Sequence, residues 1–382
     1  MRKTIYLDYA AATPMDDGVL AAMRPYYNIQ FHNPSATYLA GRQVKTALEE
    51  ARARIAVCLG PKKSEIVFTA GATEANNLAI QGIMRGRPDG EVLTSAIEHD
   101  SVLQPVKLFI NKSVPVLLSG LVDTTKIQKM ISPKTVLVSV MLVNNELGTI
   151  QPLREIAAII QNIRKTRQIA GNKKPLYLHT DAAQAGNYLD LHVSRLGVDM
   201  MSINGGKIYG PKQSGALFIK TETKITPLIS GGGQERGLRS GTENVPGAVG
   251  LAMALELAQA KRKTEAQRVD GLKNLFATLL QKNIKSFVIN GSQKHTAPHL
   301  LSVTIPGQDN ERLMMALDEY GVQCAIGSAC SASSKNPSHV LEAIGLSDKA
   351  ARSTLRFSLG RDSSEEDIRY TVAKLALITA RL

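Results

Sequence analysis

The residues best suited to chemistry lie in three short segments. In NGGKIYGPK, residues 204–212, one lysine, Lys207, stands between a Gly-Gly pair and a Gly-Pro turn. A solvated surface lysine needs no such rigid frame, whereas an amine that must reach one particular atom does. Asp181 follows a strand-like run in HTDAAQ, and residues 71–73 (GAT) open a helix with small residues and a hydroxyl. A helix start offers free N–H groups and the positive end of the dipole, which favour a phosphate.

These features combine into the set of groups that pyridoxal phosphate (PLP) requires. Each is weak alone, because a strand-end aspartate is more often a helix cap and many helices begin with small residues. Together, the lysine can form a Schiff base with the cofactor aldehyde, the carboxylate can keep the pyridine nitrogen protonated, and the helix start can hold the phosphate. The glycine run at 231–233 lacks the strand–turn–helix context of a dinucleotide-binding fingerprint, so a Rossmann site is set aside.

Buried-looking strands alternate with amphipathic helices through the first two thirds of the chain. The strands are expected at residues 65–69, 135–143, 175–181 and 215–220. This alternation predicts an α/β fold whose mostly parallel sheet is flanked by helices on both faces. Ligands bind beyond the carboxyl ends of such strands, where Thr73, Asn145 and Asp181 fall.

The pattern changes near residue 250, where a long helical stretch leads into a smaller unit. We predict a large cofactor-binding domain at residues 15–250 and a small α+β domain formed by residues 1–14 and 251–382, with a loop at about 324–337. The last helix is expected to begin with a capping box from Ser363 to Glu366. Its apolar stripe is formed by Ile368, Val372 and Leu375.

The composition is ordinary for a globular protein. Of 382 residues, 43% are apolar and 21% charged, and no run is long enough for a membrane span or a signal peptide, so a cytoplasmic location is expected. Three cysteines without a C-x-x-C pair argue against a disulfide framework, and no metal site is expected. The net charge of +13 fits either nonspecific attraction to anions or an anionic partner such as a tRNA or an acidic acceptor protein. Because the basic residues are scattered, direct nucleic-acid binding is not expected.

A series of ordered sequence blocks runs nearly from end to end of the chain. They are YLDYAAATP, NPSA, FTAGATEANNLAIQG, SAIEHDSVL, SVMLVNNELGTIQP, HTDAAQ, KIYGPK, GGGQERGLRSGTENV, GSACSAS, PSHVLEAIG and LRFSLGR. With these blocks the sequence resembles the cysteine desulfurases of the NifS/IscS type, which are PLP-dependent enzymes of the class V aminotransferase family. The resemblance implies the fold type I of PLP-dependent transferases, a homodimer, and conversion of L-cysteine to L-alanine with transfer of sulfur to an acceptor protein.

The resemblance also implies roles for the cofactor-binding residues. Lys207 would be the Schiff-base lysine, and Asp181 would pair with the pyridine nitrogen. His99, in EHDSVL, would stack on the cofactor ring and shuttle a proton. Ala72 and Thr73 would hold the phosphate.

A second group of residues is implied to serve the substrate or the partner subunit. Gln184 and Asn145 would hydrogen-bond the ring oxygen or the substrate, and Asn33 would assist. Arg356, in LRFSLGR, would clamp the substrate carboxylate in a bidentate pair. Thr242, in RSGTEN, would reach the phosphate bound by the other subunit.

Cys330 decides which reaction the family resemblance implies. Its surroundings, AIGSACSASSKNPS, are small and polar, which fits a nucleophile on a mobile loop better than a buried structural thiol. The Cys330 thiolate would attack the substrate sulfur and carry it as a persulfide to an acceptor that serves iron–sulfur cluster assembly or tRNA thiolation. Cys324 and Cys58 are interpreted as structural.

The sequence departs from the family pattern beside the lysine. Most members carry a histidine directly before the lysine and a serine three positions before it, and both donate to the phosphate; here these positions are Gly206 and Asn204. The Asn204 amide and the Gly206 backbone N–H can recover part of the lost binding, so we expect weaker PLP retention with an intact Schiff base. Members that serve the housekeeping iron–sulfur scaffold often have a longer C-terminal tail than ITARL, so docking to that scaffold is in doubt.

Two other functions remain open from the sequence. One is a related PLP enzyme, such as a selenocysteine lyase or a transaminase, since selenium chemistry can spare the cysteine. The other is a degenerate member kept as a partner-binding scaffold, which the unusual Gly206 and Asn204 suggest. Retention of the predicted catalytic residues argues against the scaffold.

Overall fold

The structure is a computed structural model that describes residues 4–327 and 337–381, so Cys330 lies outside the described residues. A seven-stranded sheet dominates it, with the strand order β2-β8-β7-β6-β5-β3-β4. Its strands are β2 (Ile66–Thr69), β3 (Glu91–Ser95), β4 (Ile110–Val114), β5 (Thr135–Ser139), β6 (Tyr177–Asp181), β7 (Met200–Asn204) and β8 (Gly215–Ile219). All neighbouring pairs are parallel except those of β8, which runs antiparallel to both β2 and β7. The expected α/β sheet, mostly parallel, is confirmed.

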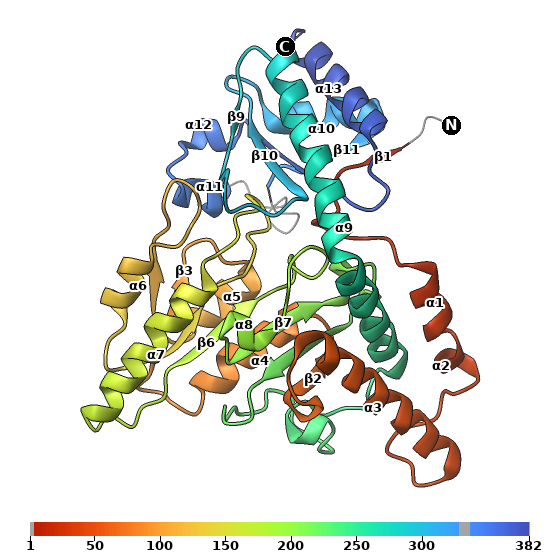
Figure 1. Ribbon diagram of the computed structural model, residues 1–382, viewed down its shortest axis with the longest axis vertical. Coiled ribbons are helices and arrows are strands. Elements are labelled where there is room, and N and C mark those ends of the chain that lie inside the picture. Colours follow the sequence, from red (N-terminus) through yellow and green to blue (C-terminus); the bar gives the residue numbers. More distant parts are fainter. Residues whose placement is uncertain (1–3, 328–336, 382) are drawn as a thin grey trace.

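Helices cover both faces of this sheet (Figure 1). They are α1 (Asp17–Met23), α2 (Pro25–Asn28), α3 (Leu39–Leu59), α4 (Ala72–Met84), α5 (Asp100–Val106), α6 (Thr124–Met130), α7 (Leu153–Ile169), α8 (Val193–Leu196) and α9 (Val245–Asn283), with the 3-10 turns η1 (Lys63–Glu65), η2 (Gly205–Lys207) and η3 (Glu235–Gly237). Alternate residues of a strand point to opposite faces. In β3, Val92 packs in the apolar cluster of α4 and α5, whereas Leu93 packs in that of α3, α7 and α9. Burial on both faces explains why these strands read as continuous apolar runs.

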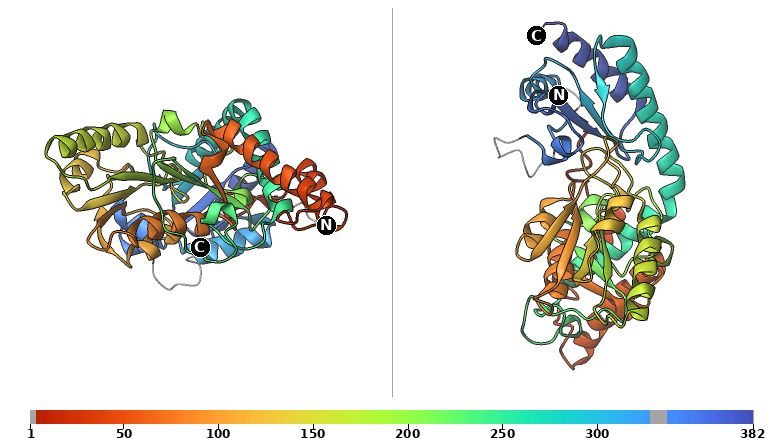
Figure 2. Two further views of the ribbon diagram at one scale, coloured as in Figure 1. Left: turned by 90° about the horizontal axis from the view of Figure 1, so that it is seen from below. Right: turned by 90° about the vertical axis from the view of Figure 1, so that its left-hand side faces the viewer.

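The C-terminal third forms a second, smaller unit that also takes up the N-terminal strand. A three-stranded antiparallel sheet, β12-β10-β9, lies beside the parallel pair β1-β11. The elements are β1 (Ile5–Tyr6), β9 (Val288–Ile289), β10 (Leu300–Thr304), α10 (Asn310–Glu319), β11 (Val322–Gln323), α11 (His339–Ala343), α12 (Asp348–Ala351), β12 (Thr354–Ser358) and α13 (Glu365–Thr379). Their apolar residues form a separate core that includes Leu7, Phe276 and Phe357. The long helix α9 runs alongside both units (Figure 2) and crosses the predicted boundary at residue 250, and the domain division stays a prediction.

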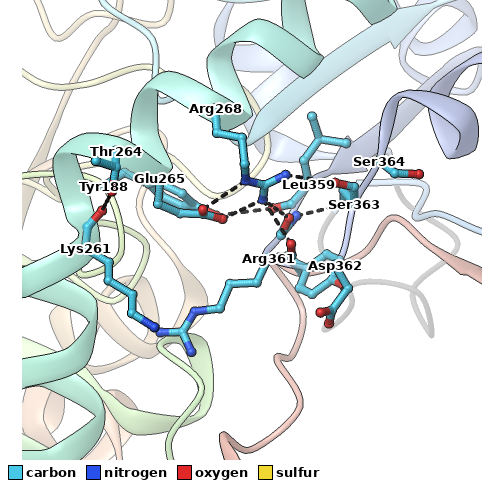
Figure 3. A network of polar contacts seen from close by, with 12 residues as sticks. Tyr188, Lys261, Thr264, Glu265, Arg268, Leu359, Arg361, Asp362, Ser363 and Ser364 are labelled. Atoms are coloured by element: carbon cyan, nitrogen blue, oxygen red, sulfur yellow. Dashed lines mark hydrogen bonds and ion pairs between the residues drawn. The ribbon is translucent and has the colours of Figure 1, made fainter.

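A polar network connects α9 with the loop before α13 (Figure 3). Arg268 of α9 donates to the backbone oxygens of Gly360, at 2.8 Å, and Ser363, at 2.9 Å, in the loop before α13. In the same loop, Arg361 forms an ion pair with Asp16, at 2.8 Å, and its guanidinium lies 3.9 Å from the centre of the Tyr209 ring. The backbone N–H of Arg361 donates to the Tyr209 hydroxyl at 2.7 Å. The loop is therefore held from both units.

Two details of the expected elements are corrected. The strand predicted at 135–143 ends at Ser139. The backbone N–H groups of Val140 and Leu142 still donate to carbonyl oxygens of β6, at 3.1 and 2.8 Å, and Met141 and Val143 line the cavity described below. The capping box of α13 is formed by Ser364 and Asp367, not by Ser363 and Glu366. The Ser363 hydroxyl instead accepts from the backbone N–H of Gly360 at 3.0 Å, so the tight loop shifts the helix start by one residue.

No helix in residues 4–327 and 337–381 is long and apolar enough to cross a membrane. The same residues contain no cluster of three or more histidine, cysteine, aspartate or glutamate side chains that could hold a metal ion.

Candidate active site

A cavity of about 190 Å³ lies at the carboxyl ends of the central parallel strands. Most of the site residues predicted from the sequence line it: Ala72, Thr73, His99, Asn145, Asp181, Gln184, Asn204, Lys207 and Arg356. A more open cleft adjoins it and adds Gly206 to the lining. The fold thus brings together residues that are up to 284 positions apart in the chain. This is expected where ligands bind beyond the carboxyl ends of parallel strands.

The predicted phosphate seat is the N-terminus of α4. Gly71 caps this helix with a φ of 130°, a conformation that side-chain-bearing residues rarely adopt. The loop also lies against β8, since a Cβ atom at Gly215 would come within 2.6 Å of the Gly71 Cα. Both glycines are therefore needed to form a bare loop that presents the backbone N–H groups at the start of a 13-residue helix.

The frame around Lys207 explains its unusual sequence setting. A Cβ atom at Gly205 would lie 2.2 Å from the Ser214 hydroxyl, and one at Gly210 would lie 2.9 Å from Ala254. Tyr209 adopts a left-handed φ of 61°, and its backbone N–H donates to the Thr13 hydroxyl at 2.8 Å. The Lys207 ammonium points into the cavity, where it donates to the carbonyl oxygens of Ala10, at 2.7 Å, and Ala11, at 2.5 Å. The amine is held by neutral acceptors that it can leave.

The two positions that depart from the family pattern lie next to each other. The Asn204 side-chain oxygen accepts from the backbone N–H of Gly206 at 3.1 Å, so this N–H is engaged within the turn. A Cβ atom at Gly206 would meet only Asn204 and Lys212, both at 3.6 Å, which is ordinary van der Waals contact. The glycine is thus not required by packing, and space for a side chain remains beside Thr73 and Lys207 in the open cleft.

Asp181 is held by donors on both carboxylate oxygens. The backbone N–H of Ala183 donates to Oδ1 at 2.9 Å, and the side-chain amide of Asn76 donates to Oδ2 at 2.7 Å. Both donors fix the orientation of the Asp181 side chain. Asp181 is 6% exposed at the end of β6, which suits a fixed charge that faces a protonated ring nitrogen.

Gln184 is oriented by a buried histidine that the sequence did not single out. Its side-chain nitrogen donates to the Ala10 carbonyl at 2.9 Å, and its oxygen lies 3.4 Å from Nε2 of His299. Burial lowers the pKa of His299 to about 3, so the ring stays neutral. The ring stacks on Tyr188 with centroids 4.5 Å apart.

Arg356 reaches the cavity from β12 and is almost fully buried, at 2% exposed. One terminal nitrogen donates to the Asn145 carbonyl at 3.0 Å, and the other pairs with Asp8 at 2.6 Å. Among the described residues, its Nε has no hydrogen-bond partner. Arg356 lines the cavity, where a guanidinium is suited to bind the carboxylate of a ligand. Asp8 was not predicted, although it stands in the quoted block YLDYAAATP.

Two buried glutamates near the cavity were also missed by the sequence reasoning. Glu98 precedes His99, accepts from the Ser95 hydroxyl at 2.5 Å and from the backbone N–H of Met141 at 2.8 Å, and burial raises its pKa to about 8. Burial also raises the pKa of Glu146, whose carboxyl accepts from the Ser338 hydroxyl at 2.5 Å. For Glu98, the sequence offered one signal, which is its position directly before the predicted site residue His99.

Some predicted site residues do not line this cavity. Asn33 lies in an exposed loop, where its side chain accepts from the backbone N–H of Ser35 at 2.8 Å. Thr242 lines a separate hollow beside β2 and α9. Their roles toward the substrate and the other subunit stay predictions. Cys324 packs against the core of the small unit, and burial raises the pKa of its thiol to about 12, which fits the structural interpretation. Cys58 packs against the large core.

The arrangement fits PLP. The start of α4 would hold its phosphate, Asp181 would face its ring nitrogen, and Lys207 would bond to its aldehyde carbon. When bound, the cofactor supplies an electron sink that makes the Cα proton of an amino acid acidic. The observation behind this fit is the set of groups that border one cavity: a carboxylate with fixed donors, an amine that donates to backbone carbonyl oxygens, and a bare helix start.

Comparisons with known proteins identify the family of the chain. The profile of the family "Aminotransferase class-V" matches residues 5–370. The cysteine desulfurase IscS of Dictyoglomus turgidum is 39% identical over all of this chain and 96% of its own length, and that of Rickettsia rickettsii is 37% identical over 96% and 89%.

Solved structures give the same result. A structure described as a "NifS-like protein" superposes with a TM-score of 0.91 at 32% identity and covers both chains completely. One described as "SspA in complex with cysteine" has a TM-score of 0.81 at 38% identity over 93% of this chain and 99% of its own. The resemblance inferred from the sequence blocks is confirmed, and the chain belongs to the class V aminotransferase family of PLP-dependent enzymes.

Proposed function

We propose that the protein is a PLP-dependent cysteine desulfurase that converts L-cysteine to L-alanine and carries the sulfur as a persulfide on Cys330. The observation that carries the proposal is the joint placement of Lys207, Asp181 and Arg356 around one cavity. These groups supply an amine, a fixed negative charge and a carboxylate clamp, which an α-amino acid substrate requires.

The chain's own groups have distinct tasks in this reaction. Arg356, which lines the cavity, would bind the substrate carboxylate and thereby fix the Cα–H bond relative to Lys207. With the cofactor and substrate bound, Lys207 Nζ would remove the Cα proton. The same nitrogen lies within reach of the carbonyls of Ala10 and Ala11, which would hold it in position while it carries the proton.

The sulfur step requires a thiolate near Arg356. The Cys330 sulfur would attack the substrate sulfur, so that an S–S bond forms as the Cβ–S bond breaks. The electron pair of the broken bond stays on the carbon skeleton, which takes up protons and leaves as alanine. Cys330 lies outside the described residues, but the residues on both sides of 328–336 lie beside the cavity: Ala325 exchanges backbone hydrogen bonds with Arg356, at 2.7 and 3.1 Å, and Ser338 bonds to Glu146.

The partners and location follow from the same proposal. L-Cysteine is the substrate, and a second copy of the chain would form a homodimer in which Thr242 faces the other subunit's cofactor site. The acceptor would be a sulfur-carrying protein for iron–sulfur cluster assembly or tRNA thiolation. The relatives named cysteine desulfurase IscS and the NifS-like structure support a sulfur-transfer role. A cytoplasmic location remains a prediction.

One assay tests this function against its alternatives. The purified chain is supplied with PLP and L-cysteine, and alanine and sulfide are measured for the native protein, Cys330→Ser and the matched control Cys324→Ser. A desulfurase should lose sulfide and alanine production in Cys330→Ser and retain both in Cys324→Ser, since a thiol with a pKa of about 12 is a poor nucleophile at neutral pH. Undiminished alanine production in Cys330→Ser would indicate a selenocysteine lyase or another family enzyme. A protein that binds no PLP would indicate a scaffold.

A further inference from the structure

His99 and Asp181 are joined by a chain of hydrogen bonds through two side chains that the reaction above does not use. Nδ1 of His99 lies 2.8 Å from the hydroxyl of Ser101. That hydroxyl oxygen lies 2.9 Å from the side-chain nitrogen of Asn76, which lies 2.7 Å from Oδ2 of Asp181. Ser101 and Asn76 are both buried, and Asn76 is fully inaccessible.

The chemistry at the two ends fixes the direction of every bond in this chain. At one end, the backbone N–H of Ser101 also donates to His99 Nδ1, at 3.1 Å, so in neutral His99 this nitrogen is an acceptor and carries no hydrogen. At the other end, the Asp181 carboxylate can only accept, so the amide nitrogen of Asn76 must face it. The Asn76 nitrogen donates to Ser101, which leaves the Ser101 hydroxyl to donate to Nδ1.

The orientation of Asn76 has a cost that packing alone does not explain. Its side-chain oxygen is buried and has no hydrogen-bond partner among the described residues. Buried polar atoms are normally paired, and each exception calls for a reason. Turning the amide over would place this oxygen against the Asp181 carboxylate, so the carboxylate keeps the amide in its observed orientation.

We propose that Asn76 and Ser101 are positioning residues that fix neutral His99 in the tautomer with its hydrogen on Nε2 and that transmit the charge of Asp181 to Nδ1. His99 then offers an N–H, not a lone pair, from Nε2 to the cavity that it lines. The inference rests on the proposed function only for the task of His99. In the desulfurase, the proton that His99 holds or gives up is the one at Nε2.

Nitrogen NMR of the PLP-bound protein with ¹⁵N-labelled histidine tests the proposal without an activity assay. The His99 signals are assigned by their loss in His99→Gln. The expected result is a proton-bearing Nε2 and a hydrogen-bonded acceptor at Nδ1. Ser101→Ala should shift the Nδ1 signal toward that of a less hydrogen-bonded nitrogen, and Ser101→Thr should restore it.

His179 provides a matched control within the same spectrum. It is buried in β6, the strand that ends at Asp181, and its nitrogens lie 2.9 Å from the Ser139 hydroxyl and 3.1 Å from that of Ser202. Its signals should not move in Ser101→Ala, and Ser139→Ala should move them while leaving those of His99 unchanged.

The transmission of charge is tested by combining substitutions. Asp181→Asn should shift the His99 Nδ1 signal in the native background, and the shift should largely disappear when Ser101→Ala is also present. A hydrogen found on Nδ1 would overturn the tautomer, and equal shifts in both backgrounds would overturn the relay. This comparison uses only Asp181→Asn and Ser101→Ala, so it does not require an Asn76 variant that folds. The signals report the relay whether or not the protein releases sulfide, so failure here and failure of the desulfurase assay are separate outcomes.

Discussion

Gly206→His is expected to tighten PLP binding. The family resemblance implies a histidine directly before the lysine, whereas this chain has Gly206. The structure shows room for the side chain: a Cβ atom at this position meets its nearest neighbours, Asn204 and Lys212, at 3.6 Å, and the cleft beyond is open. A histidine can therefore be introduced without moving the backbone of the lysine turn.

The size of the effect follows from the restored donor. A hydrogen bond to a charged group contributes about 1.5–3 kcal/mol, from which about 0.5–1 kcal/mol of side-chain ordering is subtracted. The remaining gain of about 0.5–2.5 kcal/mol corresponds to a dissociation constant that is lower by roughly twofold to seventyfold. Asn204→Ser would free the backbone N–H of Gly206, which is now bound by the asparagine oxygen at 3.1 Å, and should add to the gain.

The assay is a titration of the cofactor-free protein with PLP, together with the rate of PLP loss on dialysis. Gly271→His is the matched control, because Gly271 lies on the exposed surface of α9 with no atom within 4 Å of a Cβ. It should leave the dissociation constant unchanged. If Gly206→His folds normally and binds PLP no more tightly than the native chain, the phosphate is not deficient in donors at this position and the reasoning fails.

Four further predictions concern single groups. Lys207→Ala should abolish the covalent link to PLP, measured by mass spectrometry after borohydride reduction, while the protein still folds. Cys330→Ser should retain PLP with unchanged visible absorption and produce no persulfide with L-cysteine, measured by alkylation and mass spectrometry. Asp8→Asn should lower the free energy of unfolding by about 3 kcal/mol, which is the low end for a broken buried pair because the Asp8 side chain is 19% exposed. Added L-alanine should recover part of this loss, since its carboxylate can pair with Arg356. Burial raises the pKa of Glu98 to about 8 in the folded protein, so the folded state holds a proton that the unfolded state releases above about pH 4.5. The free energy of unfolding should therefore fall as the pH rises from about 4.5 to about 8, by at most about 1.4 kcal/mol per pH unit. In Glu98→Gln, this part of the pH dependence should be absent from denaturation curves measured across the same range.

The parts of the site that sequence reasoning reached are those set by local rules. Lys207 was recognisable from its glycine frame, and residues 71–73 from the requirements of a helix start. Asp181 could be placed because parallel strands end at a common edge. Each of these signals is contained within about ten residues of the chain.

The supporting groups could not be reached in this way, because they depend on which segments meet. Asn76 bonds to Asp181, 105 positions away, and Arg356 pairs with Asp8, 348 positions away. Nothing near Asn76 distinguishes a buried donor from a surface asparagine on α4. The start of α13 was predicted one residue too early for a related reason. The loop before this helix is held by Arg268 of α9, which is about 95 positions away in the chain.

The contact of Arg361 with Tyr209 and Asp16 has a consequence for the choice of substrate. Arg361 follows Arg356 by five residues, and Tyr209 follows Lys207 by two, so this contact joins the segment after the proposed carboxylate clamp to the turn of the cofactor lysine. Arg356 and Lys207 are therefore tied to one another through residues that do not line the cavity. This tie would serve the carboxylate and the Cα atom, which every α-amino acid shares, so discrimination between cysteine and other amino acids would have to arise elsewhere.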